Sequence, residues 1–84
     1  MDKTNNRTKR WLLKKASTSE YVAIRNEANL TPLQEQTMDY IVLKKESVVA
    51  TSLALHISDT TVKRKTREAL DKMSRLLYRH FPTP

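Results

Sequence analysis

The 84-residue chain contains no glycine at all. Glycine makes up roughly 7% of the residues of an average protein, so its complete absence constrains the fold strongly. It excludes the glycine-rich loops that hold phosphates and dinucleotides, and it removes the Asn-Gly and Asp-Gly turns that tight β-hairpins favour. We therefore predict an all-α protein.

The length and the residue types exclude several function classes. A chain of this size holds one hydrophobic core, so we expect one small domain and no enzyme with an enclosed substrate cavity. The chain has no cysteine and only two histidines, His56 and His80. This excludes disulfides and thiol catalysis, and we expect no metal site and no cofactor. The apolar runs are too short for a membrane span or a signal peptide, so we expect a cytoplasmic protein without membrane association.

Positive charge gathers at the two ends of the sequence. The formal net charge is +7, from 16 Lys and Arg against 9 Asp and Glu. Residues 1–17 hold six basic residues against Asp2 alone, residues 59–84 hold seven basic against three acidic residues, and the middle is slightly acidic. No compact fold needs such an excess for its own stability, so a polyanionic partner explains it best. The alternative is a solvated tail and a solvated helix face.

Two capping signals mark helix starts. Ser17 and Glu20 have the spacing of a capping box, in which each side chain bonds the backbone N–H of the other residue. Thr31 and Gln34 repeat that spacing, with Pro32 at the first helical position, where its missing N–H costs nothing. We predict one helix that closes before Thr31 and a second that runs to about Lys45. Their expected buried faces are Tyr21, Ile24 and Ala28 in the first, and Leu33, Thr37, Tyr40, Ile41 and Lys44, with Met38 and Val42 beside them, in the second.

Residues 1–16 precede these signals and form a basic N-terminal arm or a short helix around Trp11. The Asn5-Asn6 pair and the crowded like charges predict that the first residues fray. Trp11 could insert into a membrane interface, but we expect it to hold the arm against the domain formed by residues 17–84. The basic side chains of the arm then stay available to DNA phosphates.

Two further helices are predicted after residue 46. Ser47 to Leu55 is rich in β-branched residues, but a strand without a partner strand cannot satisfy its backbone, so we predict a short buried helix. Ser58 can cap the next helix, and Pro82 prevents its continuation past about Phe81. Its apolar stripe consists of Val62, Thr66, Ala69, Leu70, Met73, Leu76 and Leu77.

A short apolar helix followed by a capped helix with many basic residues in its first half is typical of a helix-turn-helix. The first turns of the second helix enter the major groove, where Arg64 can donate two hydrogen bonds to a guanine. We thus expect a small helical domain of four to five helices with a long C-terminal recognition helix. The candidates for base contact are Thr60, Thr61, Lys63, Arg64 and Arg67. The candidates for phosphate contact are Lys65, Lys9, Arg10, Lys14, Lys15, Lys44 and Lys45.

The segments Leu30-Thr31-Pro32-Leu33-Gln34-Glu35-Gln36 and Ile57-Ser58-Asp59-Thr60-Thr61-Val62-Lys63-Arg64 resemble region 4 of sigma factors, the last DNA-binding region of those proteins. The run from Ser58 to Leu70 is most similar to small phage late-transcription regulators of the ArpU type. The resemblance covers roughly residues 30–77. It implies a sequence-specific transcription regulator of phage or prophage type, with double-stranded DNA as its partner and RNA polymerase as a further one.

The sequence departs from that family pattern in the first motif helix and in the turn. Counting back from Val62 puts Ser52 where the pattern has a small alanine, and His56 where it has a turn glycine. Histidine tolerates the left-handed conformation better than most residues, so the turn can survive. Alternatively, Val49, Ala50 and Leu53 are the family's apolar trio, and the turn is about two residues longer. Thr66 in place of a large apolar residue predicts a smaller contact between the long helix and the core.

Two alternatives remain at the level of function and assembly. The chain could be a sigma-like interaction module that binds RNA polymerase or another host protein through its acidic middle, with only weak affinity for DNA. The residues Leu70, Met73, Leu77 and His80 follow a heptad step for little more than one repeat. They could pair with a second copy in a homodimer through the C-terminal helix, or cover the preceding helices of the same chain.

Overall fold

The computed structural model describes residues 3–80 and the side chains of residues 4–77. Within that range the chain forms five α-helices and one π-helical turn, and no strand, which confirms the predicted all-α class. The elements are α1 (Lys3–Lys14), α2 (Thr18–Glu27), α3 (Pro32–Met38), η1 (Asp39–Leu43), α4 (Val48–Leu55) and α5 (Asp59–His80). The end of α5 predicted near Phe81 lies outside the described residues.

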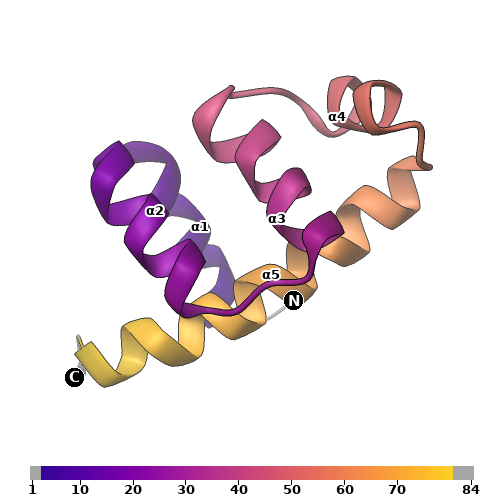
Figure 1. Ribbon diagram of the computed structural model, residues 1–84. Helices are drawn as coiled ribbons and strands as arrows, with labels where there is room; N and C mark the ends of the chain where they lie inside the picture. The colour runs from indigo at the N-terminus through magenta and orange to yellow at the C-terminus, as the bar shows by residue number, and fades with distance from the viewer. Residues whose placement is uncertain (1–2, 81–84) are drawn as a thin grey trace.

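The long helix α5 is the axis on which the other helices pack (Figure 1). α1 and α2 lie along its C-terminal half, whereas α3 and α4 lie toward its start. The side chains of α5 that face inward join residues of α1, α2, α3 and η1 in a single core. This core consists of Leu12, Tyr21, Met38, Ile41, Val42, Val62, Ala69, Leu70 and Met73.

The predicted helix starts are confirmed at the level of single hydrogen bonds. The Ser17 hydroxyl accepts from the Glu20 N–H at 3.1 Å, and the Glu20 carboxylate accepts from the Ser17 N–H at 2.8 Å. Thr31 and Gln34 form the same reciprocal pair at 3.4 and 3.1 Å. The helix that begins at Pro32 was expected to reach about Lys45, and it ends instead at Leu43 after widening into the π-helical turn.

Residues 3–14 form a helix, so of the two alternatives for the N-terminal segment the short helix is observed. The predicted fraying is not observed from Thr4 onward, because Asn5 is buried and its side chain is hydrogen-bonded at both ends; Met1 and Asp2 lie outside the described residues. Its amide donates to Asp71 at 2.5 Å, and its carbonyl oxygen accepts from the Ser74 hydroxyl at 2.9 Å. The hydroxyls of Thr8 and Ser74 lie 2.8 Å apart. These bonds join α1 to α5 across more than sixty residues of sequence.

Trp11 and Leu12 anchor α1 in the core. Leu12 is among the most deeply buried side chains, and the partly buried Trp11 packs against the core cluster. The prediction that Trp11 holds this segment against the rest of the domain is therefore confirmed. None of the helices in the described range combines the length and the apolar character needed to traverse a bilayer.

Of the heptad residues on α5, Leu70 and Met73 point into their own chain. Leu70 and Met73 are buried in the core, and Leu77 is half-buried. The His80 side chain lies outside the described part of the structure. Of the two alternatives for this stripe, Leu70 and Met73 therefore follow the second, because they are covered by α1 to α3 and η1 of the same chain.

The short helix α4 forms where predicted, but it is not buried as expected. Val49 and Leu53 are 56% and 72% exposed, whereas the polar residues Thr51 and Ser52 face the interior. The Ser52 hydroxyl is satisfied within its own helix, because it donates to the Val49 carbonyl at 2.7 Å, whereas the buried Thr51 hydroxyl has no hydrogen-bond partner among the described residues.

Candidate nucleic-acid interface

Helices α4 and α5 are joined by a turn of three residues, His56, Ile57 and Ser58. His56 has φ 57° and ψ 44°, the left-handed conformation predicted for it in place of a glycine. The N–H groups of His56 and Ile57 both reach the Ser52 carbonyl, which closes the end of α4. A three-residue turn is the length found in helix-turn-helix units, so the structure favours the register counted back from Val62 over the longer turn.

We expect His56→Val to lower the free energy of unfolding by about 1–2 kcal/mol, because a β-branched residue is strongly disfavoured at positive φ. His56→Gly is expected to stay within about 1 kcal/mol of the wild type, because relief of the left-handed strain is offset by the higher entropy of unfolded glycine. Urea denaturation followed by circular dichroism measures both. Equal stability of the two variants would contradict the role of His56 in the turn.

The start of α5 is fixed by Ser58. Its hydroxyl accepts from the Thr61 N–H at 3.1 Å, and the Ser58 and Thr61 hydroxyls lie 2.8 Å apart. The capping role predicted for Ser58 is therefore observed. Thr61, one of the five base-contact candidates, therefore has its hydroxyl hydrogen-bonded within the helix cap. Its neighbour Thr60 is exposed.

Thr60, Arg64 and Arg67 follow one another at steps of four and three residues, so they share one face of α5. Val62, on the opposite side, is fully buried and fixes which face is turned outward. Lys63 is also exposed, at the edge of this face. At a rise of about 1.5 Å per residue, the face extends along roughly 10 Å of helix, which is comparable to the width of the major groove. We call Thr60, Lys63, Arg64 and Arg67 the α5 face.

The cations of the α5 face have no hydrogen bond or ion pair among the side chains described, those of residues 4–77. The ion pairs of this range are formed instead by Arg25 and by Lys65. The positive charge of Arg64 is one of the causes that lower the pKa of Glu68, but the two side chains form no ion pair. Three basic side chains that the fold does not use thus stand together at the beginning of one helix.

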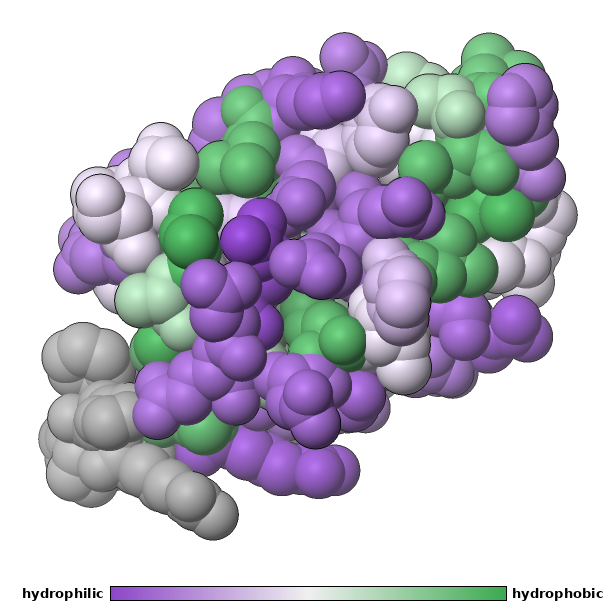
Figure 2. Space-filling view, viewed as in Figure 1, coloured by the Kyte–Doolittle hydropathy of each residue, from purple (hydrophilic) through white to green (hydrophobic). Residues whose placement is uncertain are grey.

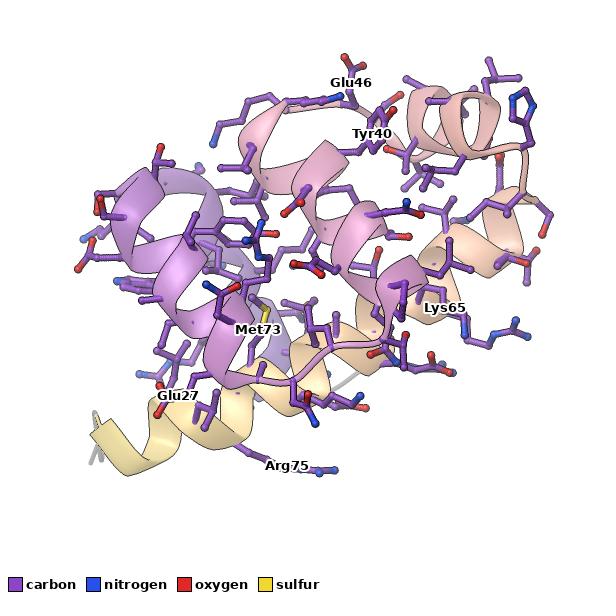
Figure 3. The ribbon with its side chains drawn as sticks, viewed as in Figure 1. Glu27, Tyr40, Glu46, Lys65, Met73 and Arg75 are labelled. Atoms are coloured by element: carbon purple, nitrogen blue, oxygen red, sulfur yellow. The ribbon has the colours of Figure 1, made fainter. Side chains whose placement is uncertain are left out.

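Lys65 lies on a different side of α5, which faces α3 (Figure 3). Its ammonium is 3.3 Å from the Glu68 carboxylate, which also accepts from the Gln34 side-chain amide at 3.1 Å. The hydrogen bond from Gln34 is the largest cause of the lowered pKa of Glu68. Lys72 completes this group by donating to the Gln34 carbonyl oxygen at 3.0 Å. Lys65 therefore stabilises the contact between α5 and α3, and it does not belong to the α5 face.

The phosphate-contact candidates of the N-terminal segment meet those that follow η1. The Lys45 ammonium donates to the Leu13 carbonyl at 2.8 Å, which brings Lys45 beside Lys14 and Lys15 at the end of α1. We call Lys14, Lys15 and Lys45 the lysine cluster. Figure 1 places the ends of α1 and η1 across the fold from the start of α5, so the cluster and the α5 face are separate basic surfaces.

The other phosphate-contact candidates are not gathered in this way. The Lys44 ammonium lies over the Tyr40 ring, 4.1 Å from its centroid. Lys9 is half-buried and Arg10 is exposed on α1. The sequence predicted two basic regions. The structure shows in addition that Lys45 lies at the end of α1, beside Lys14 and Lys15.

Arg75 is a basic residue that the sequence analysis did not select. It lies eleven residues after Arg64, which is three helical turns, so it continues the same side of α5. Figure 3 shows it projecting from α5 away from the other helices. The helical spacing alone could have identified it. Asp71, between the two arginines, is occupied by the hydrogen bond from Asn5.

The acidic middle of the chain is used largely inside the fold. The Arg25 guanidinium donates to both Asp39 oxygens at 3.0 and 3.1 Å and lies 3.0 Å from Glu35. The Tyr21 hydroxyl donates to Asp39 at 2.7 Å, and burial followed by this hydrogen bond raises the Tyr21 pKa, so the hydroxyl stays protonated. These contacts join α2 to α3 and η1. They leave less of the acidic charge for a partner than the sequence suggested.

The described residues contain no group of three or more His, Asp or Glu side chains arranged as metal ligands. Comparisons with protein families, with curated proteins and with solved structures found no match for this chain.

Proposed function

We propose that this protein is a sequence-specific DNA-binding transcription regulator that reads the major groove with the first turns of α5. The observation that carries this proposal is the α5 face, with three unpaired cations at the start of a capped helix behind a three-residue turn. An exposed set of cations without internal partners is expected where a polyanion binds. The resemblance of the run from Ser58 to Leu70 to ArpU-type regulators supports a phage or prophage setting.

Each exposed residue has a specific role in this proposal. The Arg64 guanidinium donates to the O6 and N7 atoms of one guanine, because its planar fork matches their spacing. Thr60 contacts a thymine methyl or a phosphate at the start of the helix, while Lys63 and Arg67 reach the bases or phosphates on either side. Arg75 and the lysine cluster lie outside the groove, where they contact flanking phosphates and contribute affinity without sequence preference.

Binding is expected to weaken steeply as salt rises. If about six to eight cations of the α5 face, α1 and the lysine cluster meet phosphates, the log–log slope of affinity against salt is roughly −5 to −7. Fluorescence anisotropy with a labelled duplex, between about 50 and 200 mM salt, measures this slope. A nearly flat dependence would contradict the proposal.

A capture experiment from host lysate distinguishes this proposal from a protein-interaction module. A DNA reader loses the proteins that co-purify with it when the lysate is treated with nuclease, since those proteins are held through DNA. Capture of RNA polymerase that survives nuclease treatment, together with weak binding to every duplex tested, would favour the interaction module instead.

A further inference from the structure

Two acidic residues in the middle of α5 do not pair with the arginines beside them. Glu68 follows Arg64 by four residues, a spacing at which oppositely charged side chains of one helix commonly form an ion pair. Asp71 follows Arg67 by the same interval. Figure 2 shows mostly hydrophilic surface along the lower edge of the molecule, where α5 runs. Among the described side chains, neither arginine pairs with its acidic neighbour, although each acid is within reach.

The Glu68 carboxylate is held on the side of α5 that faces α3. It accepts from the Gln34 amide at 3.1 Å and lies 3.3 Å from the Lys65 ammonium. Gln34 is itself fixed, because it is only 5% exposed and its carbonyl oxygen accepts from the Thr31 N–H and from the Lys72 ammonium. Gln34 is thus a buried side chain whose amide donates to a charged residue of the neighbouring helix.

Movement of Glu68 toward Arg64 is opposed by this hydrogen bond. The movement would leave the buried amide of Gln34 without a partner, and an unpaired buried donor carries a full desolvation penalty. An exposed ion pair between Arg64 and Glu68 gains too little to offset that penalty. The pKa of Glu68 reflects the same balance, because the hydrogen bond from Gln34 is the largest cause that lowers it and the charge of Arg64 is the smallest. Gln34 therefore determines which partner Glu68 takes.

The same arrangement recurs one turn later on α5. The Asp71 carboxylate accepts from the side-chain amide of Asn5 in α1 at 2.5 Å, and Asn5 is also buried. An amide is a neutral donor, so it satisfies a carboxylate without adding a charge. Both acidic residues in the middle of α5 are thus bound by an amide of another helix, and both arginines stay unpaired.

We propose that Gln34 is a positioning residue of the DNA-binding site, which keeps the Arg64 guanidinium free for a guanine by holding Glu68 against α3. This inference rests on the proposed function, because the freedom of Arg64 matters only if Arg64 reads DNA. Gln34 is buried and acts only through Glu68. A Glu68 carboxylate released from Gln34 pairs with Arg64, where it occupies the donors that the guanine needs and brings a negative charge toward the phosphates.

Gln34→Glu removes the amide donor and keeps the other contacts of this position. A glutamate still accepts from the Thr31 N–H and from Lys72, but its carboxylate repels Glu68. Anisotropy titrations should show binding to the preferred duplex weakened about two- to fivefold more than in Gln36→Glu, which adds the same charge at an exposed position of α3. The preference for the guanine should relax in Gln34→Glu alone.

The exchange of Gln34→Glu together with Glu68→Gln restores the hydrogen bond with donor and acceptor reversed. It has the net charge of the wild type and leaves no acidic side chain four residues after Arg64. The exchanged variant should therefore recover the wild-type affinity and the preference for the guanine. A purely structural role of Gln34 would affect stability and all duplexes alike, and it would not change the preference at one base pair.

Nuclear magnetic resonance of the free protein tests the side-chain contacts without DNA. In the otherwise wild-type chain, Glu68→Gln should shift the side-chain amide signals of Gln34 and leave the exchange of the Arg64 Nε–H with water unchanged. In Gln34→Glu that exchange should become slower, because Glu68 then accepts from Arg64. This result does not depend on DNA, whereas absence of any base preference in the wild type would count against the proposed function itself.

Two results would overturn the role of Gln34. One is an Arg64 Nε–H whose exchange changes with Glu68→Gln in the otherwise wild-type chain, which would show that the two residues already pair. This measurement needs no change at Gln34, so it stands even if Gln34→Glu does not fold. The other is a folded Gln34→Glu variant with the affinity and the base preference of Gln36→Glu.

Discussion

Arg64→Ala is expected to weaken binding to the preferred duplex by about 1–3 kcal/mol, which is roughly 5- to 150-fold. Arg64 lies at the centre of the α5 face, is exposed, and has no hydrogen bond or ion pair within the described residues. Its loss removes a bidentate contact to one guanine, so the preference at that base pair should also relax. Anisotropy titrations against the preferred duplex and against single-base variants of it measure both effects.

Lys14→Ala is the matched control for Arg64→Ala. Lys14 belongs to the lysine cluster across the fold and is also an exposed cation, so its removal takes away the same charge. It should weaken binding to all duplexes by the same factor and reduce the salt slope by about 1. Equal losses of affinity and of base preference from the two variants would contradict the assignment of Arg64 to base recognition.

Leu12→Ala is expected to lower the free energy of unfolding by about 2–5 kcal/mol. Leu12 is only 1% exposed and joins α1 to the core around α5. A domain of this size has a total stability of about 4–13 kcal/mol, so this single change removes a large fraction of it. Deletion of residues 1–16, which also breaks the hydrogen bonds of Asn5 and Thr8, should leave the chain largely unfolded. Urea denaturation followed by circular dichroism measures the stability of both variants.

Arg10→Ala separates the structural role of α1 from its charge. Arg10 is an exposed residue on the same helix, so its removal should change the stability by no more than about 0.5 kcal/mol. It should still weaken DNA binding in proportion to one lost phosphate contact. If Leu12→Ala proved as mild as Arg10→Ala, or if the shortened chain folded as well as the full one, α1 would be an accessory arm rather than a part of the core.

The helix starts could be predicted from the sequence because their causes are local. Ser17, Thr31 and Ser58 each bond a backbone group three residues away, so the residue types and their spacing contain the whole interaction. The left-handed conformation of His56 was instead implied by the family pattern, which has a turn glycine at that position. The buried stripe of α5 could likewise be predicted, because its residues recur at helical spacing.

The position of α1 could not be predicted, because it depends on contacts between distant residues. Asn5 disfavours a helix when only its neighbours are considered, but here its side chain bonds Asp71 and Ser74 in α5. The exposure of α4 was missed for a related reason. Its apolar composition indicates burial, and only the packed fold reveals that Thr51 and Ser52 point inward.

The residues of the candidate site could largely be predicted from the sequence, but the contacts that they make could not. Basic residues at helical spacing identified the α5 face, and the same spacing extended by three turns would have identified Arg75. The sequence could not reveal that Lys65 pairs with Glu68, that Lys45 binds the end of α1, or that Lys44 lies over Tyr40. Such contacts decide which cations remain without a partner inside the fold.

Selection of bound sequences from a random duplex library, at near-physiological salt, tests the central claim most directly, because it separates reading of the bases from attraction of charges. We expect an enriched motif that contains at least one guanine, and loss of the preference for that guanine when the selection is repeated with Arg64→Ala. Absence of any enriched motif, with binding that vanishes as salt rises, would contradict the account and leave only nonspecific attraction between a basic protein and DNA.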